Sequence, residues 1–504
     1  MEKQDIPFFR RPVFWLIIIF LVVLATRLYI ALGTEQFNYD AYFSLRQVDS
    51  IRSTGFPLYN DPLSYGGKTQ LFAPLYYYLL AFFSFIMSTT LAAKIIPNIL
   101  ASLIVVASYY ISLKMTKSAK ISMTIAFMSG FIPVYFIDIN RISVNYLAVL
   151  LVFSVIYCMF RINERRYVDY ALILMFLLVL TTPLAFVLVL GLLIYLLLLK
   201  LENLEIQMKE LEIILFFTFL VFWVNLLIYK NAFLGEGLLV IWQNIPVKIL
   251  SNFFGDIGFL ELLITVSLVP LILGVYAFYS TLHKDQNKET ILIIAFGTGS
   301  FILLWFKLVD IINGIMFLSL TLTILTAYSL KRFSDFIEKS KIRRYGKWLL
   351  ALMLILFIAT AIVPSIMYGI NKSKETPTQD DIDVLKWSST HLQKDATIAA
   401  TVDEGDLVAY YANRKNIMDV NFLLTPNIDK RLSELDEIYT TSFETKAVED
   451  LNKYKAQYIL LTPYAKKYYG IDNITYMQDS KCFRVEYLRN DTTLYLTDCR
   501  IKTI

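Results

Sequence analysis

Residues 12–46 read PVFWLIIIFLVVLATRLYIALGTEQFNYDAYFSLR, an apolar run followed at once by a polar segment. At ~1.5 Å of rise per residue, the apolar part, residues 12–32, is long enough as a helix to cross ~30 Å of hydrocarbon. The carboxylate of Asp40 follows shortly after that run. An acidic side chain in this place predicts chemistry at the boundary between lipid and water.

Composition places the rest of the chain in the same class. Of its 504 residues, 57% are hydrophobic, with 37 Phe and 33 Tyr, which is more apolar sequence than one soluble core holds. The first run has no small-residue cleavage site after it, so we interpret it as a retained anchor and not as a signal peptide. The chain is predicted to be a polytopic α-helical membrane protein.

Eleven apolar runs have the length and composition expected of membrane spans. They are residues 12–32, 93–113, 121–137, 146–160, 168–182, 184–199, 211–229, 259–280, 290–306, 311–330 and 348–368. With a cytoplasmic N-terminus, the inner segments hold 20 of the 29 Lys and Arg residues that precede residue 369, as the positive-inside rule requires. An odd number of spans then puts the C-terminal part outside the cell membrane.

The apolar, tyrosine-rich segment 72–87 is of marginal length for a span. Counting it as a span would turn every later basic loop to the outside, against the positive-inside rule. We therefore predict that this segment lies in the membrane interface, with its tyrosines at the level of the lipid headgroups.

Charge divides the chain near residue 369. Residues 369–504 hold 39 of the 89 Asp, Glu, Lys and Arg side chains, and the net charges of the two parts are +8 and −3. We predict a membrane domain, residues 1–368, and a small external α/β domain, residues 369–504, in which helical and strand-like segments alternate. Loop orientation explains the basic excess of the membrane part, so no nucleic-acid partner is predicted.

Two cysteines of the C-terminal part, Cys482 and Cys499, flank two strand-like runs joined by a turn at residues 489–492. In a hairpin centred on that turn, paired residue numbers sum to 981, which places the cysteines opposite each other. We predict a disulfide, in keeping with an oxidising external compartment; two reduced cysteines in a hairpin core are the alternative. The Asn-x-Ser/Thr sequons of the chain also fall in this part, at Asn371, Asn473 and Asn490.

Carboxylates are the candidate catalytic groups. The chain has two histidines and no glycine-rich nucleotide-binding motif, which disfavours a histidine zinc site, a Ser-His-Asp triad and a nucleotide cofactor. Asp40 follows the first span, and Asp138 and Asn140 lie in the turn between the third and fourth spans, at the same depth. We predict that these three positions bind a hard cation, Mg²⁺ or Mn²⁺, or that one acid acts as a general base. For Asp138, a solvated turn is the alternative.

Three basic residues near the outer boundary are candidates for contacts with a lipid-linked phosphate. Arg27 lies inside the first span, where an unpaired charge costs a few kcal/mol, so it is either functional or directed outward to water. Lys307 lies in a short outer turn, and Arg46 lies in the loop after the first span. For Arg27 and Lys307, a phosphate contact and a solvated charge are both open.

The first outer loop resembles that of a known family. The stretches Tyr39-Asp-Ala-Tyr-Phe-Ser-Leu-Arg46, Asp61-Pro-Leu-Ser-Tyr-Gly-Gly67 and Pro74-Leu-Tyr-Tyr-Tyr78 are similar to this loop in GT-C membrane glycosyltransferases, and among these to archaeal oligosaccharyltransferase catalytic subunits. The resemblance implies a polyprenyl-phosphate or polyprenyl-diphosphate sugar donor and Asp40 as the aspartate of the active centre. It also implies that Asp138-Ile-Asn140 takes the place of a second acidic motif.

Two departures from that family bear on the acceptor and on the metal. The Trp-Trp-Asp-Tyr-Gly motif, which recognises the acceptor sequon, is absent, and the chain has Thr401-Val-Asp-Glu-Gly-Asp406 instead. Asn140 stands where a further acid is usual, which weakens the prediction of a metal. We therefore predict an inverting transfer of a sugar from a polyprenyl-phosphate-type lipid to a protein, lipid or glycan acceptor on the external face, other than a sequon asparagine.

Three alternative functions stay open. One is an oligosaccharyltransferase that acts on sequon asparagines. Another is a transporter or lipid flippase, which the scarcity of intramembrane acids and the lack of an inverted repeat disfavour. The third is an inactive scaffold of the same fold, because a fold does not fix a function.

Overall fold

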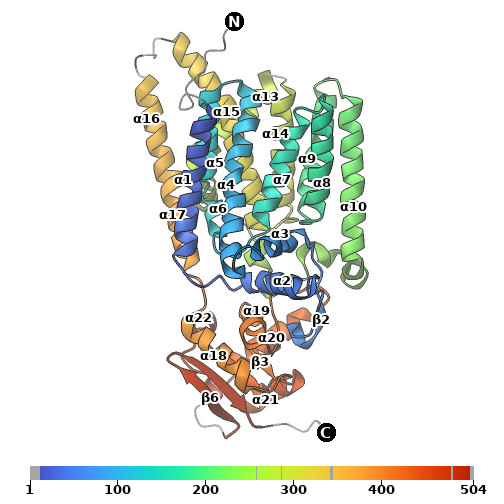
Figure 1. Cartoon of the computed structure of the whole chain (residues 1–504), viewed down its shortest axis with the longest axis vertical. Helices are drawn as coiled ribbons and strands as arrows, with labels where there is room; N and C mark the ends of the chain where they lie inside the picture. Colours follow the sequence, from blue (N-terminus) through green and yellow to red (C-terminus); the bar gives the residue numbers. More distant parts are fainter. Residues whose placement is uncertain are drawn as a thin grey trace.

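The computed structural model describes residues 12–256, 258–284, 287–340, 344, 346–477 and 481–499. A bundle of long helices makes up most of the molecule, and a smaller part with a five-stranded sheet lies at one end of it (Figure 1). We call this smaller part, the described residues from 374 onward, the tail. Helix α1, Pro12–Leu32, runs through the bundle toward the tail end.

Every apolar run that was expected to span the membrane is helical in the structure. After α1 the helices are α4 Thr89–Thr116, α5 Ala119–Gly130 with the short α6 Val134–Ile137, α7 Asn145–Met159, α8 Arg165–Val179, α9 Ala185–Leu201, α10 Met208–Glu236, α11 Val247–Phe254, α12 Phe259–Val266, α13 Leu268–Lys284, α14 Lys288–Trp305, α15 Ile311–Lys339, α16 Gly346–Phe357 and α17 Val363–Ser373. Within the described residues, seven helices are long and apolar enough to cross a membrane by themselves, or eight if the bent pair α11 and α12 forms one span.

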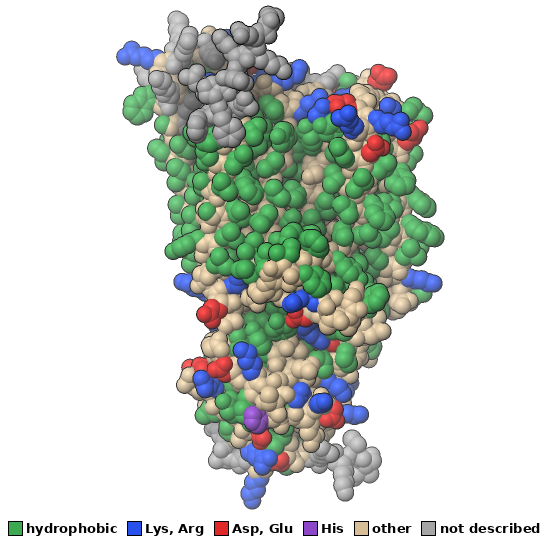
Figure 2. Space-filling view, viewed as in Figure 1, with side chains coloured by type: hydrophobic (Ala, Val, Ile, Leu, Met, Phe, Trp, Pro, Cys, Tyr) green, Lys and Arg blue, Asp and Glu red, His purple; other side chains and the backbone are tan. Residues whose placement is uncertain are grey.

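On the face shown in Figure 2, hydrophobic side chains form a belt across the bundle, and charged side chains gather beyond both edges of this belt. Large apolar residues in the belt are exposed in the isolated chain, such as Leu227, which is 63% exposed, and Phe219, which is 65% exposed. Such a belt needs lipid around it. The chain is a multi-pass membrane protein, and the predicted fold class is confirmed.

The expected span 259–280 is not a single straight helix. The run 259–280 is interrupted at Ser267, whose φ of 78° ends α12, and α13 begins at the next residue. Sequence hydropathy did not show this break, because the apolar run continues through it.

Helix α17 ends at Ser373, past the proposed domain boundary at residue 368, and the first tail helix, α18, spans Gln379–His391. The division into two domains stays a proposal.

Two short helices, α2 Ala41–Thr54 and α3 Leu75–Ser84, lie across the tail end of the bundle (Figure 1). Helix α2 ends at Gly55, whose left-handed conformation, with φ of 83°, lets its N–H bond to the carbonyl of Ile51. The ten residues of α3 rise only ~15 Å, about half of the hydrocarbon thickness. The segment 72–87 therefore does not run through the bundle, as the positive-inside rule predicted.

The tail is an α/β unit, as expected. Its strands are β3 Thr397–Ala399, β4 Lys415–Asn416, β5 Tyr458–Leu461, β6 Phe483–Arg489 and β7 Thr492–Thr497, in the sheet order β4-β3-β5-β7-β6. The helices between them, after α18, are α19 Gly405–Leu407, α20 Ile428–Thr440, α21 Glu444–Lys453 and α22 Pro463–Tyr469. Because β3 is parallel to both β4 and β5, the residues that follow these three strands meet at one edge of the sheet.

The loop between α2 and α3 enters the tail. Its strands β1 Asn60–Asp61 and β2 Lys68–Thr69 pair antiparallel, and Tyr65 between them is buried in the hydrophobic core of the tail. The backbone N–H of Tyr65 donates to Oδ1 of Asn416 at 2.8 Å, and its hydroxyl donates to the carbonyl of Asp419 at 2.7 Å. A tyrosine of the membrane-proximal loop thus completes the tail core.

The hairpin β6–β7 carries a Cys482–Cys499 disulfide, with a Cα–Cα distance of 4.9 Å. The predicted register holds from the Arg489–Thr492 pair at the turn to the Tyr487–Leu494 pair. A β-bulge between Val485 and Tyr487 then shifts the pairing by one residue, so that Phe483 pairs with Thr497. The two cysteines are therefore not directly opposite each other in the ladder.

Candidate active site

Asp40 occupies the N-cap position of α2, at the end of the bundle that faces the tail. It accepts no capping hydrogen bond there, and its side chain is 43% exposed, whereas the next two residues, Ala41 and Tyr42, are fully buried. Partial desolvation by the surrounding protein raises the pKa of Asp40 above the ordinary 3.8. A carboxylate that is open on one side and held by packed neighbours is suited to take up a proton from a substrate.

Arg141 bridges Asp40 and Asp138. Its Nε lies 3.4 Å from Oδ2 of Asp40, and its Nη1 lies 3.4 Å from Oδ1 of Asp138. Asp138 is only 4% exposed at its side chain and also accepts a long, 3.4 Å hydrogen bond from Nδ2 of Asn145, the first residue of α7. The negative charge of Asp40 is the main reason that the pKa of Arg141 is raised. Asp40 and Asp138 thus lie near each other, as predicted, but a guanidinium stands between them.

Two further acids face this group. Asp403 follows β3 at the parallel edge of the tail sheet, accepts a hydrogen bond from the hydroxyl of Tyr464, and adds to the rise in the pKa of Asp40. Asp310 caps α15 by accepting from the backbone N–H of Asn313 at 3.1 Å, and burial together with the charge of Asp138 raises the pKa of Asp310 to about 6. We call Asp40, Asp138, Arg141, Asp310 and Asp403 the Asp40 site.

Sequence reasoning missed three members of this site. Arg141 directly follows the quoted Asp138-Ile-Asn140 segment, so its position carried a usable signal. Asp403 follows strand β3, and residues at the carboxyl ends of parallel strands converge. The proximity of Asp310 to Asp138 depends on how α15 packs, and no local pattern reveals it.

Aromatic contacts hold the loop around Asp40 against the tail. The ring of Tyr39 lies 4.6 Å from that of Tyr464 between centroids, and Tyr42 lies 5.4 Å from Tyr410 and 5.5 Å from Tyr411. Ring pairs at these separations contribute about 0.5–1.5 kcal/mol each beyond the area that they bury. The tail therefore fixes the backbone on both sides of Asp40.

The three residues predicted to hold a metal do not form a shared ligand set as the structure places them. The cation of Arg141 occupies the position between Asp40 and Asp138. The amide of Asn140 donates to Oγ1 of Thr34 at 3.3 Å and to the carbonyl of Gln36 at 2.8 Å, and its Oδ1 is enclosed without a hydrogen-bond partner. A divalent ion bound to both carboxylates would lie next to the guanidinium charge, so we derive no step through a metal.

Of the basic residues predicted to contact a phosphate, Arg27 faces the interior of the bundle. It is 1% exposed, its Nε donates to Oδ1 of Asn98 at 3.0 Å, and its Nη1 donates to the carbonyl of Tyr135 at 2.9 Å. The guanidinium lies between the rings of Phe136 and Tyr146, 5.0 and 4.8 Å from their centroids. These contacts explain how a charge is accommodated inside the first span, and they leave it no access to a ligand.

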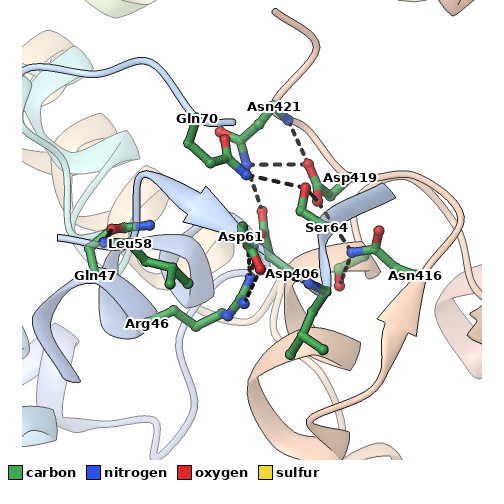
Figure 3. Close-up of polar contacts among 12 residues, drawn as sticks. Arg46, Gln47, Leu58, Asp61, Ser64, Gln70, Asp406, Asn416, Asp419 and Asn421 are labelled. Atoms are coloured by element: carbon green, nitrogen blue, oxygen red, sulfur yellow. Dashed lines mark hydrogen bonds and ion pairs between the residues drawn. The ribbon is translucent and has the colours of Figure 1, made fainter. Parts of the chain in front are cut away.

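Arg46 connects the first loop to the tail. Its Nη1 and Nη2 donate to the carboxylate of Asp61 at 2.6 and 2.7 Å, and Nη1 lies 4.0 Å from Oδ1 of Asp406 (Figure 3). Ser64 donates to Asp419 at 2.5 Å in the same cluster. Because Arg46 is only 8% exposed and already paired, its contacts indicate a structural role.

Lys307 is the most accessible of the three. Its backbone is left-handed, with φ of 55°, its side chain is 43% exposed, and its Nζ lies 3.0 Å from Oδ1 of the exposed Asp256. Exposed ion pairs of this kind are weak and exchange readily. Lys307 lies three residues before Asp310, and its ammonium group is partly exposed.

Comparison with known proteins relates the chain by structure and not by sequence. No protein-family model and no curated protein sequence matches it. The apo oligosaccharyltransferase of Archaeoglobus fulgidus superposes with a TM-score of 0.70 at 14% identity, over 94% of this chain and 73% of that one. ArnT from Cupriavidus metallidurans, bound to undecaprenyl phosphate, superposes with a TM-score of 0.58 at 11% identity, over 95% of this chain and 97% of that one.

The mycobacterial arabinofuranosyltransferase AftD superposes with a TM-score of 0.59 at 12% identity, over 96% of this chain and 40% of that one. The chain has the GT-C fold. Other structures of the Archaeoglobus enzyme contain zinc and sulfate, or an inhibitory peptide with a dolichol-phosphate. The GT-C resemblance predicted from the first loop is confirmed for the fold of the whole described chain, membrane bundle and tail together.

Proposed function

We propose that this protein is a membrane glycosyltransferase, which transfers a sugar from a polyprenyl-phosphate-type lipid to an acceptor on the external face of the membrane. The observation that carries the proposal is the position of Asp40 in a GT-C fold. Its carboxylate is partly exposed at the tail end of the bundle and lies 3.4 Å from Arg141. Undecaprenyl phosphate in ArnT and dolichol-phosphate in the Archaeoglobus enzyme support a lipid donor of this class.

The reaction is a single displacement at the anomeric carbon. A hydroxyl or amide of the acceptor attacks this carbon, the bond from the carbon to the phosphate oxygen breaks, and its electron pair leaves with the lipid phosphate. The acceptor proton passes to the carboxylate of Asp40. Attack opposite to the leaving group inverts the configuration at the sugar.

Each charged side chain has a different role in this reaction. A raised pKa makes the ionised Asp40 a stronger base than an ordinary aspartate, and Arg141 supplies a counter-charge 3.4 Å from its carboxylate. Lys307, with its exposed ammonium group, would contact the phosphate of the donor in the bound state. In this proposal Arg27 and Arg46 support the fold.

The tail favours an acceptor other than a sequon asparagine. Glu404 follows β3 and is fully enclosed, with hydrogen bonds from the hydroxyls of Thr401 and Thr462. This segment therefore presents a satisfied, inward-facing carboxyl, and it lacks the tryptophans of the oligosaccharyltransferase motif. At this edge Asp403 lies close enough to Asp40 to raise its pKa, and Tyr464 packs against Tyr39, so we propose that these two tail residues face the acceptor.

The test is transfer from a synthetic polyprenyl-phosphate hexose by the purified protein in liposomes, followed as release of polyprenyl phosphate with a membrane extract as the acceptor source. Asp40→Asn should lower this rate by ~10²-fold or more, the usual cost of losing a general base. Asp49→Asn is the matched control, because Asp49 lies on the same helix and its carboxylate accepts a hydrogen bond from Thr89. Full activity of the Asp40→Asn protein would contradict the assignment of Asp40 as the general base.

The same preparation separates the alternatives. A flippase would move labelled lipid between leaflets without cleaving it, and Asp40→Asn would leave that movement unchanged. An inactive scaffold would bind the lipid without turnover. Lys307→Ala should raise KM for the donor more than it lowers kcat, because it removes a phosphate contact that is already made in the bound state.

A further inference from the structure

An apolar groove lies in the half of the bundle away from Asp40. It has a volume of about 370 Å³ and is bounded by α4, α7 and α8. Its lining includes Ala107 and Tyr110 of α4, Leu150 and Cys158 of α7, and Tyr170 and Leu174 of α8. Helix α7 begins at Asn145, whose side chain bonds to Asp138, so its residues 150–158 lead away from the Asp40 site.

The groove opens on the lipid-facing surface. Tyr110 and Tyr170 at its margin are 38% and 54% exposed, and Ile173 on the same helix as Tyr170 is 57% exposed. Lipid chains are what surround this surface in a bilayer. An open apolar channel at that depth is therefore filled by a hydrocarbon chain and not by water.

One end of the groove leads to a polar cluster. Tyr157 and Tyr167, which line it, accept hydrogen bonds from Nη1 of Arg161, and the guanidinium lies 4.1 Å from the ring centroid of Tyr167. Glu164 pairs with Arg161 at 2.7 Å. Tyrosines with their rings in an apolar groove and their hydroxyls on an arginine mark the change from hydrocarbon to headgroup depth.

Basic residues surround this end. Lys114 is one helical turn beyond Tyr110 and so lies on the same face of α4, and Arg165 and Arg166 at the start of α8 are exposed. The turns 114–120 and 161–169 together carry six Lys and Arg residues against two acids. The excess of positive charge lies where the phosphate of a lipid would be if its chain occupied the groove.

We propose that this groove binds one acyl chain of an anionic glycerophospholipid, whose phosphate lies against the basic turns. The apolar lining accounts for the chain, and charge complementarity accounts for the headgroup. The occupant is not the sugar donor, because α7 separates the groove end from the Asp40 site by on the order of 20 Å. The proposal is independent of sugar transfer and holds for any function of the bundle.

Binding is measured on the purified full-length protein by native mass spectrometry, with phosphatidylglycerol and phosphatidylcholine as probes. Phosphatidylglycerol should be retained more strongly. The pair Arg165→Gln and Arg166→Gln should weaken its binding roughly tenfold or more, since each basic residue near a lipid surface contributes on the order of 1 kcal/mol. The pair Lys466→Gln and Lys467→Gln in the tail is the control and should change nothing.

Filling the groove tests the acyl chain separately. Ala107→Trp should abolish retained phosphatidylglycerol, whereas Leu197→Trp, at a position of α9 that is 55% exposed, should not. Equal binding by these two variants would overturn the proposal. Equal retention of the two lipids by the wild-type protein would do the same for the headgroup contact.

Cys158 provides a readout that needs no variant. It lines the groove and is the free cysteine of the chain, since Cys482 and Cys499 form a disulfide. Alkylation of Cys158 by a small maleimide should slow several-fold as phosphatidylglycerol is added to the detergent-solubilised protein, and phosphatidylcholine should have a smaller effect. An unchanged rate across the phosphatidylglycerol titration would contradict occupancy of the groove.

Discussion

The ring of Tyr39 lies against the ring of Tyr464, with centroids 4.6 Å apart, so the residue that precedes Asp40 packs on the first turn of α22. The hydroxyl of Tyr464 also donates to Asp403. One tail residue thus contacts both the backbone segment of the proposed base and a neighbouring acid of the Asp40 site.

Tyr464→Ala should therefore lower kcat for sugar transfer several-fold without weakening donor binding. Removing the ring frees the segment around Asp40, and loss of precise placement is costly in catalysis. Tyr464→Phe keeps the ring contact and loses only the hydrogen bond to Asp403, so it should retain most of the activity. Equal loss in both variants would assign the effect to Asp403 and not to the packing of Tyr39.

The pH dependence of transfer should report the ionisation of Asp40. Its raised pKa means that the carboxylate is lost at a higher pH than for an ordinary aspartate, so kcat/KM should fall as the pH drops through that raised value. Asp403→Asn removes a negative charge that raises the pKa of Asp40, and the acid limb should then move to lower pH. A limb that stays in place in this variant would show that another group is titrating.

Arg141 tests whether the site works through a guanidinium or through a metal ion. Arg141→Ala should cost ~10²-fold in transfer or more, because it leaves Asp40 without its cation, whereas Arg141→Lys should retain part of the activity. Wild-type transfer should persist in EDTA, since Arg141 occupies the position between the two carboxylates. Loss of activity in EDTA that Mn²⁺ restores would contradict this expectation and favour the predicted metal.

Glu404 should make the tail less stable as the pH rises. Burial raises the pKa of Glu404 from 4.5 to about 8, so the folded state holds a proton that the unfolded state releases. Its contribution to stability is complete below about pH 4.5 and is lost as the pH rises through about 8. Thermal unfolding followed by tryptophan fluorescence should show this decline, and Glu404→Gln should flatten it. A profile that is identical in the two proteins would contradict the assignment.

The disulfide between Cys482 and Cys499 closes a segment with a sequence separation of 17. In the chain-entropy model a loop of this length is worth ~3 kcal/mol. The intact mass should rise by the label of two additional thiols when the protein is alkylated after reduction, compared with alkylation before it. Reduction should also lower the unfolding temperature of the tail, and Cys158→Ser is the control that removes the remaining thiol.

The helices could be predicted from sequence because long apolar runs decide them locally. The break at Ser267 was not predicted, because hydropathy is averaged over many residues and does not respond to the backbone conformation of one of them. In the hairpin the alternation of side chains predicted both strands, but the bulge between Val485 and Tyr487 depends on how β6 packs and shifted the register beyond it.

The candidate site was predictable only in part. Asp40 and Asp138 are acids that follow apolar runs, and this local pattern was enough to predict them as candidate site residues. The sequence did not decide whether Arg27 is functional or directs its charge outward to water. The structure gives a third solution, in which Asn98 and the carbonyl of Tyr135 solvate the guanidinium from other helices. Partners of this kind are brought together by tertiary packing, which sequence spacing does not encode.

Tyr65 has a consequence for the order in which the protein assembles. The backbone N–H of Tyr65 pairs with Asn416, a residue 351 positions later in the chain. Synthesis proceeds from the N-terminus, so the first loop reaches its side of the membrane long before its partners exist. Until the C-terminal strands are made, the ring of Tyr65 has no core to enter, and Arg46 with Asp61 lacks Asp406. A chain that stops early therefore displays an unfinished loop beside Asp40, and helix α2, which Asp40 caps, lacks its contacts with the tail until that part is made.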